Sequence, residues 1–304
     1  MIRTITVINR LNETLELDLF HPEKSGFAIE DVTGLGPVRA SINLAEFSTI
    51  DGAVYNSARI PSRNIVMKLI LLPKPDIETT RQLSYKFFPI KQRVKLVIDT
   101  DNRLLETTGY VEANEPIIFS EQETLQVSII CPYPFFYSSG PGSEQYTTFT
   151  GLEKKFTFPW SNESTTTKLL KMGDILKNQI ATVFYAGDNE IGITIEMEFL
   201  GDVGDLTIAN LTTGDLMEIK KSRIIAITGN QLKQGDKVFI NTIKGEKSII
   251  LLRGGVETNI LNALDKDASW FQIIKGDNVF HFDTTEGLVN ILFAVRNRII
   301  YEAI

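Results

Sequence analysis

The sequence predicts a mostly β protein with two domains. Most of its periodic segments alternate apolar and polar residues, are rich in Val, Ile, Thr and Phe, and are separated by turns that contain Gly, Asp or Asn. With 304 residues, the chain is long enough for two ordinary domains that each bury a core. Residues 138–150 hold a Ser/Gly/Pro cluster that is typical of a linker. We therefore expect domains at 1–137 and 151–304, joined by this linker.

The N-terminal domain is expected to combine strands with one helix. The helix fits residues 76–88, because Pro75 and Asp76 favour its start and Pro89 favours its end. A hairpin turn is expected at 99–102, where Asp and Asn cluster. The alternating pattern predicts strands at 2–9, 14–20, 38–48, 64–72, 93–98, 104–112 and 123–130.

The C-terminal domain repeats short strands at a spacing that is typical of a β-sandwich or jelly roll. One short helix is expected at about 257–264. The expected strands are 181–186, 191–200, 204–209, 216–220, 223–228, 237–241, 247–252, 269–274, 277–282 and 288–302.

Composition and charge argue against several classes of protein. The net charge is −7 and is shared evenly by the two halves, unlike the charge of a basic nucleic-acid reader. The longest apolar runs fall far short of the roughly 20 residues that a membrane span needs. The first residues alternate like a strand and lack the apolar core of a signal peptide. We expect a protein that is made in the cytoplasm and leaves it only as part of a larger assembly.

Residues that could carry catalysis are few. His21 and His281 are the only histidines, and neither has a second His or a Cys at metal-ligand spacing. Cys131 is the only cysteine, so it forms no internal disulfide, and it lies in a rigid apolar segment with Pro132 and Pro134. No serine lies in a nucleophile-elbow motif. We therefore expect no catalytic residues, no metal, no cofactor and no enzyme activity.

Two further features could serve sugar chemistry. Glu196 and Glu198 share one face of a strand, which can suit paired carboxylates in glycoside hydrolysis. Apolar residues fill the opposite face of that strand, so a solvated face on a half-buried strand is the favoured interpretation. Trp160 and Trp270 could each form the floor of a sugar site, but neither lies near an obvious cluster of polar ligands.

A basic segment is the strongest candidate for a binding surface. Residues 59–95 carry nine basic side chains and only two acidic ones. They could contact phosphates, but they lack the aromatic interleaving of a platform for single strands. A subunit interface that faces acidic neighbours is the favoured interpretation. The residues that we assign to it are Arg59, Arg63, Lys91 and Arg93.

Short strings that follow one another along nearly the whole chain carry a family resemblance. In the first half they are Gly34-Leu35-Gly36-Pro37-Val38-Arg39-Ala40, Tyr55-Asn56-Ser57-Ala58-Arg59, Glu115-Pro116-Ile117-Ile118-Phe119 and Cys131-Pro132-Tyr133-Pro134-Phe135-Phe136. In the second half they are Thr207-Ile208-Ala209-Asn210, Gly214-Asp215-Leu216-Met217, Gly235-Asp236-Lys237-Val238 and Gly276-Asp277-Asn278-Val279-Phe280. In this order they resemble the phage distal tail (Dit) protein family.

The resemblance implies an architecture and a role. The N-terminal domain would be a split-barrel-like belt domain with one helix, and the C-terminal domain a galectin-like β-sandwich. Six belt domains would form a ring at the tip of the tail, as part of the virion of a phage or prophage. This hub would join the tail-tube protein to the tail-associated lysin or fibre hub, often with receptor-binding proteins attached. DNA would pass through its lumen without specific binding.

A second function stays open, which is a carbohydrate-binding adhesion protein that acts through its C-terminal sandwich. The galectin-like resemblance does not itself imply sugar binding. Galectins carry a His-x-Asn-x-Arg run, whereas here His281 is followed by Phe282 and Asp283. The structural hub is therefore the leading expectation.

Overall fold

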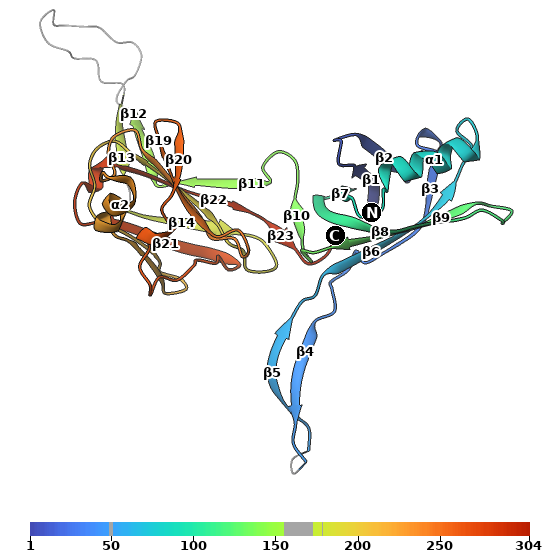
Figure 1. The fold of residues 1–304 in the computed structure, drawn as a ribbon, viewed down its shortest axis with the longest axis horizontal. Coiled ribbons are helices and arrows are strands. Elements are labelled where there is room, and N and C mark those ends of the chain that lie inside the picture. Colours follow the sequence, from blue (N-terminus) through green and yellow to red (C-terminus); the bar gives the residue numbers. More distant parts are fainter. Residues whose placement is uncertain (49–50, 155–172, 178) are drawn as a thin grey trace, which may run out of the picture. The chain divides into compact units, whose positions relative to one another are not determined.

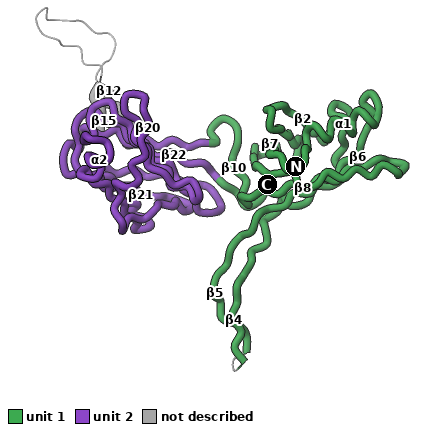
Figure 2. Tube along the Cα trace, in the orientation of Figure 1, with its two compact units in different colours: residues 1–143, 300–304 green, residues 144–299 purple. Residues whose placement is uncertain are grey.

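Strands dominate the computed structural model of the chain, which describes residues 1–48, 51–154, 173–177 and 179–304 (Figure 1). The described chain forms two compact units (Figure 2). Unit 1 comprises Met1–Ser143 together with Ile300–Ile304, and unit 2 comprises Glu144–Ile299. Residues 138–150, expected as a linker, include the end of one strand of unit 1 and a whole strand of unit 2. The chain therefore passes from one unit to the other twice.

Unit 1 is built on one antiparallel sheet with the strand order β2-β1-β7-β8-β9-β6-β3. Its strands are β1 (Ile2–Ile8), β2 (Thr14–Asp18), β3 (Phe27–Thr33), β6 (Arg63–Leu71), β7 (Arg93–Thr100), β8 (Leu104–Ile117) and β9 (Thr124–Cys131). A short strand, β10 (Phe136–Ser138), pairs with both β8 and the C-terminal strand β23 (Ile300–Tyr301). The last residues of the chain thus complete the sheet that the first residues begin.

The helix expected at 76–88 is confirmed as α1 (Ile77–Phe87). The carboxylate of Asp76 accepts hydrogen bonds from the Thr79 backbone amide at 2.7 Å and from its hydroxyl at 2.9 Å, which caps the helix N-terminus. At the other end, the amide of Asn114 donates to the Phe88 carbonyl at 3.1 Å. Phe87 and Phe88 are buried in the core of unit 1.

The buried residues of unit 1 include one arginine. Arg63 is 1% exposed and begins the inward face of β6, which continues with Ile65, Met67, Leu69 and Leu71. Its guanidinium donates to four backbone carbonyls: Pro134 at 2.7 Å, Gly36 at 2.6 Å, Glu302 at 2.6 Å, and Gly34. It also lies 4.3 Å from the centre of the Phe136 ring. The Arg63 side chain therefore links three segments of the chain by hydrogen bonds.

Gly34 is required for this arrangement. Its φ is +83°, a conformation that residues with a Cβ rarely adopt. A Cβ at this position would also lie 2.0 Å from the carbonyl oxygen of Asn64. The loop can therefore approach β6 closely enough to present its carbonyls to Arg63 only because residue 34 is glycine.

Unit 2 contains two antiparallel sheets, with strand orders β11-β22-β15-β18-β19-β20 and β14-β21-β16-β17. The first comprises β11 (Glu144–Thr148), β15 (Thr194–Phe199), β18 (Lys237–Asn241), β19 (Ser248–Arg253), β20 (Val256–Asn259) and β22 (Ile291–Arg298). The second comprises β14 (Ile180–Tyr185), β16 (Leu206–Asn210), β17 (Asp215–Ile219) and β21 (Gly276–Thr284). A separate pair, β12 (Thr150–Lys154) and β13 (Gly173–Lys177), completes the unit.

The two sheets of unit 2 pack face to face through aromatic side chains. Phe282 of β21 stacks on Phe293 of β22 with ring centres 4.7 Å apart, and Phe149 packs edge-on against both rings. A buried ion pair adds to this core, because Asp236 is 1% exposed and accepts from the Arg253 guanidinium at 2.6 and 2.9 Å. The expected β-sandwich is confirmed.

Several expected elements of unit 2 are wrong. Residues 223–228, expected as a strand, form helix α2 (Lys221–Thr228), where the Asp205 carboxylate accepts the Lys221 amide at 2.7 Å. Residues 257–264, expected as a helix, form β20 and a short 3₁₀ turn. Residues 269–274 contain only an isolated bridge at Ile273. Short isoleucine-rich runs suit either element, so tertiary partners decided the outcome.

Three described strands of unit 1 were not expected from the sequence. They are β3, β5 (Ala53–Arg59) and β10. β5 pairs with β4 (Ser41–Glu46) to form a separate two-stranded sheet. Every residue of β5 is exposed, so the strand lacks the alternation of buried and exposed positions that would identify it.

Replacing Arg63 by Met should destabilise unit 1 by about 3 kcal/mol or more, because the variant leaves four inward carbonyls without their donor. Arg59→Ala is the control: Arg59 is exposed, so the loss should be about 0.5 kcal/mol or less. Urea denaturation followed by circular dichroism would measure both. Equal stability of the two variants would contradict the assigned role of Arg63.

Candidate functional site

The most unusual surface of the molecule is the hairpin made by β4 and β5. It extends away from the large sheet of unit 1, and its strands pair only with each other (Figure 1). Five large apolar side chains on it are more than half exposed: Ile42, Leu44, Phe47, Val54 and Tyr55. We call Ser41–Phe47 together with Ala53–Arg59 the apolar hairpin.

Such a hairpin is not stable on its own in water. A two-stranded ribbon buries too little surface, and both of its outer edges leave backbone hydrogen-bonding groups unpaired. Exposed apolar side chains that gather on one element mark a surface that another molecule covers. The geometry of unit 1 therefore indicates an interface that a single chain leaves uncovered.

A second exposed apolar group lies where β8 leads into β9. Ile117 is 57% exposed, and Phe119 is fully exposed. Figure 1 shows this connection extending beyond the body of the large sheet of unit 1. Sequence analysis treated Ile117 and its neighbours only as part of a family string, because a short apolar run does not reveal whether it is buried.

The four basic residues assigned to an interface occupy different environments. Arg59 ends β5 on the apolar hairpin and is exposed. Lys91 and Arg93 are exposed at the start of β7 in the large sheet. Arg63, by contrast, is buried and binds carbonyls of its own unit, so its side chain is not available at the surface. The structure thus leaves three of the four side chains open to a partner.

Around Arg93 the structure gathers basic residues that sequence reasoning did not connect. A hollow of about 330 Å³ is lined by Ile8, Asn9, Arg10, Asn12, Arg93 and Lys95. Arg10 reaches this place because β1 pairs with β7, so the turn after β1 lies beside the start of β7. Lys95 is engaged with Glu106 at 2.8 Å. The antiparallel register, which the sequence alone did not reveal, creates this basic surface.

The residues considered for catalysis each have their own surroundings. His21 is exposed and lies 3.2 Å from Glu23, whereas His281 lies within β21 between β14 and β16. Cys131 is buried beside Arg63 in the β6–β9 register, and burial raises the pKa of its thiol. Among the described residues, no group of three His, Cys, Asp or Glu side chains has the arrangement of a metal site.

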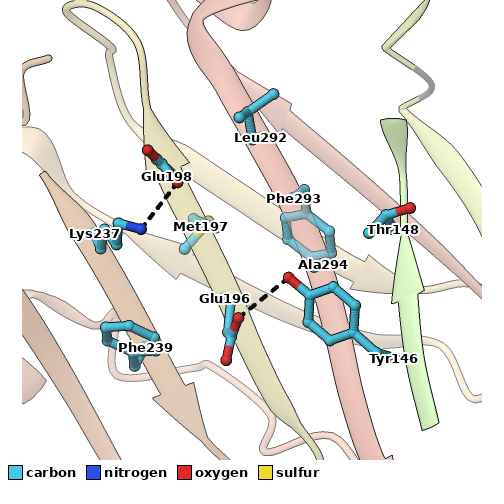
Figure 3. Close-up of a pocket in the computed structure, with 10 residues that line it drawn as sticks. All are labelled: Tyr146, Thr148, Glu196, Met197, Glu198, Lys237, Phe239, Leu292, Phe293 and Ala294. Atoms are coloured by element: carbon cyan, nitrogen blue, oxygen red, sulfur yellow. Dashed lines mark hydrogen bonds and ion pairs between the residues drawn. The ribbon is translucent and has the colours of Figure 1, made fainter. Parts of the chain in front are cut away.

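The two features considered for sugar chemistry differ in outcome. Glu196 and Glu198 lie on the outer face of the six-stranded sheet and line a hollow of about 220 Å³ (Figure 3). Trp270 is half-buried, with the Lys247 ammonium 5.1 Å from its ring centre. Trp160 lies outside the described residues.

In the described part of the chain, no helix has the length and apolar character required to cross a bilayer.

Comparison with known proteins identifies the fold. The sequence matches no protein-family model and no curated protein. Its structure is similar to that of the Dit protein of phage SPP1, described as a paradigm of the hub adsorption apparatus in phages that infect Gram-positive bacteria. The TM-score is 0.63 at 12% identity, over 96% of this chain and 98% of the SPP1 chain.

Two structures of the phage P2 baseplate in its activated conformation, with Ca and with Sr, also match. Their TM-scores are 0.49 and 0.48 at 12% and 11% identity, over the full length of both chains. The likeness to SPP1 Dit carries the assignment. The expected mostly β, Dit-like fold is confirmed over nearly the whole chain.

Cys131 should resist thiol reagents in the folded protein. Because the thiol is buried and its pKa is raised, little thiolate forms and the reagent cannot reach it. Labelling by dithionitrobenzoate at pH 8 should be at least about a hundredfold slower than in concentrated guanidinium chloride. Rapid labelling of the native chain would contradict the burial of the Cys131 side chain in the core of unit 1.

Proposed function

We propose that this protein is a structural hub subunit at the distal end of a phage tail or tail-like particle. The fold supports this proposal, because the likeness to the SPP1 hub protein extends through both units. Fold alone does not determine function, so the proposal also needs a feature of this chain. That feature is the apolar hairpin.

The apolar hairpin favours an assembly subunit over a protein that acts alone. Leu44 and Tyr55 face each other in its register and are 52% and 62% exposed. Covering their side chains would stabilise a complex by roughly 25 cal/mol for each Å² of apolar surface removed from water. An enzyme or a free binding protein would gain nothing from leaving them exposed.

The partner that we propose for the apolar hairpin is a neighbouring copy in a closed ring, which we expect to be a hexamer. A ring closes heterologous contacts, so every hairpin finds the same recipient surface and no edge stays open. Arg59, Lys91 and Arg93 are the exposed basic residues available for pairing with acidic groups across such contacts. Arg63 supports the same unit from within.

The hub would connect the tail-tube protein to a tail-associated lysin or fibre hub and, through unit 2, to receptor-binding proteins. It would be a component of the virion without enzymatic activity. The net charge of −7 suits a lumen through which DNA slides, because an acidic wall does not hold phosphates. The basic surface around Arg93 is better suited to protein contacts, because Lys95 already pairs with Glu106.

Changing Leu44 to Asp should abolish ring formation without unfolding the chain. A carboxylate on the apolar hairpin would have to be desolvated in the interface, whereas in the free subunit it stays in water. Val256→Asp is the matched control, because Val256 is 65% exposed on unit 2. Light scattering after size-exclusion chromatography should give rings for the parent and the control, and monomers for Leu44→Asp.

Rings are expected at high protein concentration or on mixing with the tail-tube and downstream hub proteins. A parent chain that stays monomeric under all of these conditions would overturn the proposal. If rings still form with Leu44→Asp, the proposed hub role stands, but the apolar hairpin is not the contact between the subunits.

A further inference from the structure

The hollow on the outer face of the six-stranded sheet of unit 2 has the construction of a binding site. The register aligns Thr148, Ala294, Glu196 and Phe239 in one row across β11, β22, β15 and β18. Ala294 supplies the low point of this row, since its neighbours on both sides are larger. The volume of about 220 Å³ is below the ~300–1,000 Å³ of pockets for drug-sized ligands, so it fits one small ring.

Two aromatic rings flank the hollow. Tyr146 of β11 reaches across β22, and its hydroxyl donates to Glu196 at 3.3 Å on the strand beyond. This crossing is possible because Ala294 leaves room above β22. Figure 3 shows Phe239 on the other side of Glu196. The aromatic faces offer apolar contact at the two sides, while the centre is polar.

The charged groups of the hollow are already paired. Glu196 accepts from Arg296 at 2.6 Å, and Glu198 pairs with Lys237 at 3.1 Å. Glu144 also lies 3.7 Å from Arg296, so three carboxylates share two cations. An anionic ligand is therefore repelled, and the carboxylates already have cationic partners. Each carboxylate still has lone pairs to offer, and ammonium and guanidinium groups have further N–H donors. Side chains held by their own partners are preorganised for hydrogen bonding.

The geometry points to a neutral saccharide as the ligand of this hollow. A sugar ring carries apolar C–H faces that fit the rings of Tyr146 and Phe239, and a rim of hydroxyls that both donate and accept. Glu198 and Lys237 provide adjacent acceptors and donors at the spacing of neighbouring hydroxyls. An anion would meet the carboxylates and the negative faces of the rings, and a purely apolar ligand would leave the charged groups that line the hollow without water.

The state of Tyr146 agrees with this assignment. Burial, and then the charge of Glu196, raise the pKa of the phenol. The hydroxyl therefore stays protonated at neutral pH and remains a donor. The site includes Glu196 and Glu198, which the sequence suggested for glycoside hydrolysis, but it uses neither tryptophan and no histidine. It would add carbohydrate recognition to a subunit whose hub role rests on unit 1.

A glycan array probed with the full-length chain tests this inference. We expect binding to neutral glycans and none that depends on sulfate or carboxylate groups. Glu198→Gln should weaken binding about tenfold, because the amide replaces an acceptor by a donor and releases Lys237. Ala294→Leu should abolish binding by filling the hollow. Glu257→Gln is the matched control on β20 of the same sheet, where Glu257 is exposed and outside the hollow.

Titration calorimetry with the glycan that binds most strongly on the array should rank the affinities of the variants in the same order. The thermal unfolding of Glu198→Gln should be unchanged. No binding to any neutral glycan at millimolar concentration would overturn the inference. Binding that survives both Glu198→Gln and Ala294→Leu would also overturn it. If these substitutions instead remove the association with a tail protein, the hollow receives a protein side chain. Ring formation should be unchanged in every variant, which separates this test from that of the hub.

Discussion

Unit 1 depends on the buried guanidinium of Arg63. A cation in a core is costly unless its donors are satisfied, and here four of the five N–H donors meet the carbonyls of Gly34, Gly36, Pro134 and Glu302. These carbonyls belong to the loop after β3, the segment after β9 and the C-terminal tail, which share no sequence neighbourhood. The contact with the tail matters most, because the chain returns to unit 1 only at Ile300. Arg63 and the β10–β23 pairing therefore hold in unit 1 a strand that follows the whole of unit 2 in the sequence.

The apolar hairpin of the same unit lacks such contacts, because its two strands pair only with each other. The sheet that Arg63 closes gives the hairpin its base, while the side chains of Ile42, Leu44, Phe47, Val54 and Tyr55 are exposed. This division suits the ring that we propose, because each subunit must be stable before its contacts form. Unit 2 is organised differently. Phe282 and Phe293 stack in its aromatic core, and the outer face of its six-stranded sheet carries paired charges around Ala294. Its candidate site is therefore present within a single chain.

Sequence reasoning succeeded where burial alternates along a strand. β6 and β15 bury every second residue, so period-two patterns predicted them, and Asp76 with Pro89 bounded α1. It failed where a distant residue decides the outcome. The segment that became α2 reads as a strand by its isoleucines, but Asp205 caps it as a helix. Arg63 was assigned to a surface because it is charged. The four carbonyls that accept its hydrogen bonds come from remote segments, which the sequence pattern does not reveal. Glu196 and Glu198 lie on the solvated face of β15, as the alternation predicted, but the crossing of Tyr146 toward Glu196 is invisible in a linear pattern.

The sequence by itself determined the fold class, the core faces of most strands, the single helix of the first half and the resemblance to distal tail proteins. Local propensity and alternation suffice for these features, because each depends on residues a few positions apart. The tertiary structure alone decided which strand closes unit 1, what Arg63 binds, that the hairpin of β4 and β5 is bare, and that a small residue at 294 opens a hollow between two rings. Each of these depends on register between strands that are far apart in the chain, and register is fixed only when the faces of the sheets are buried together.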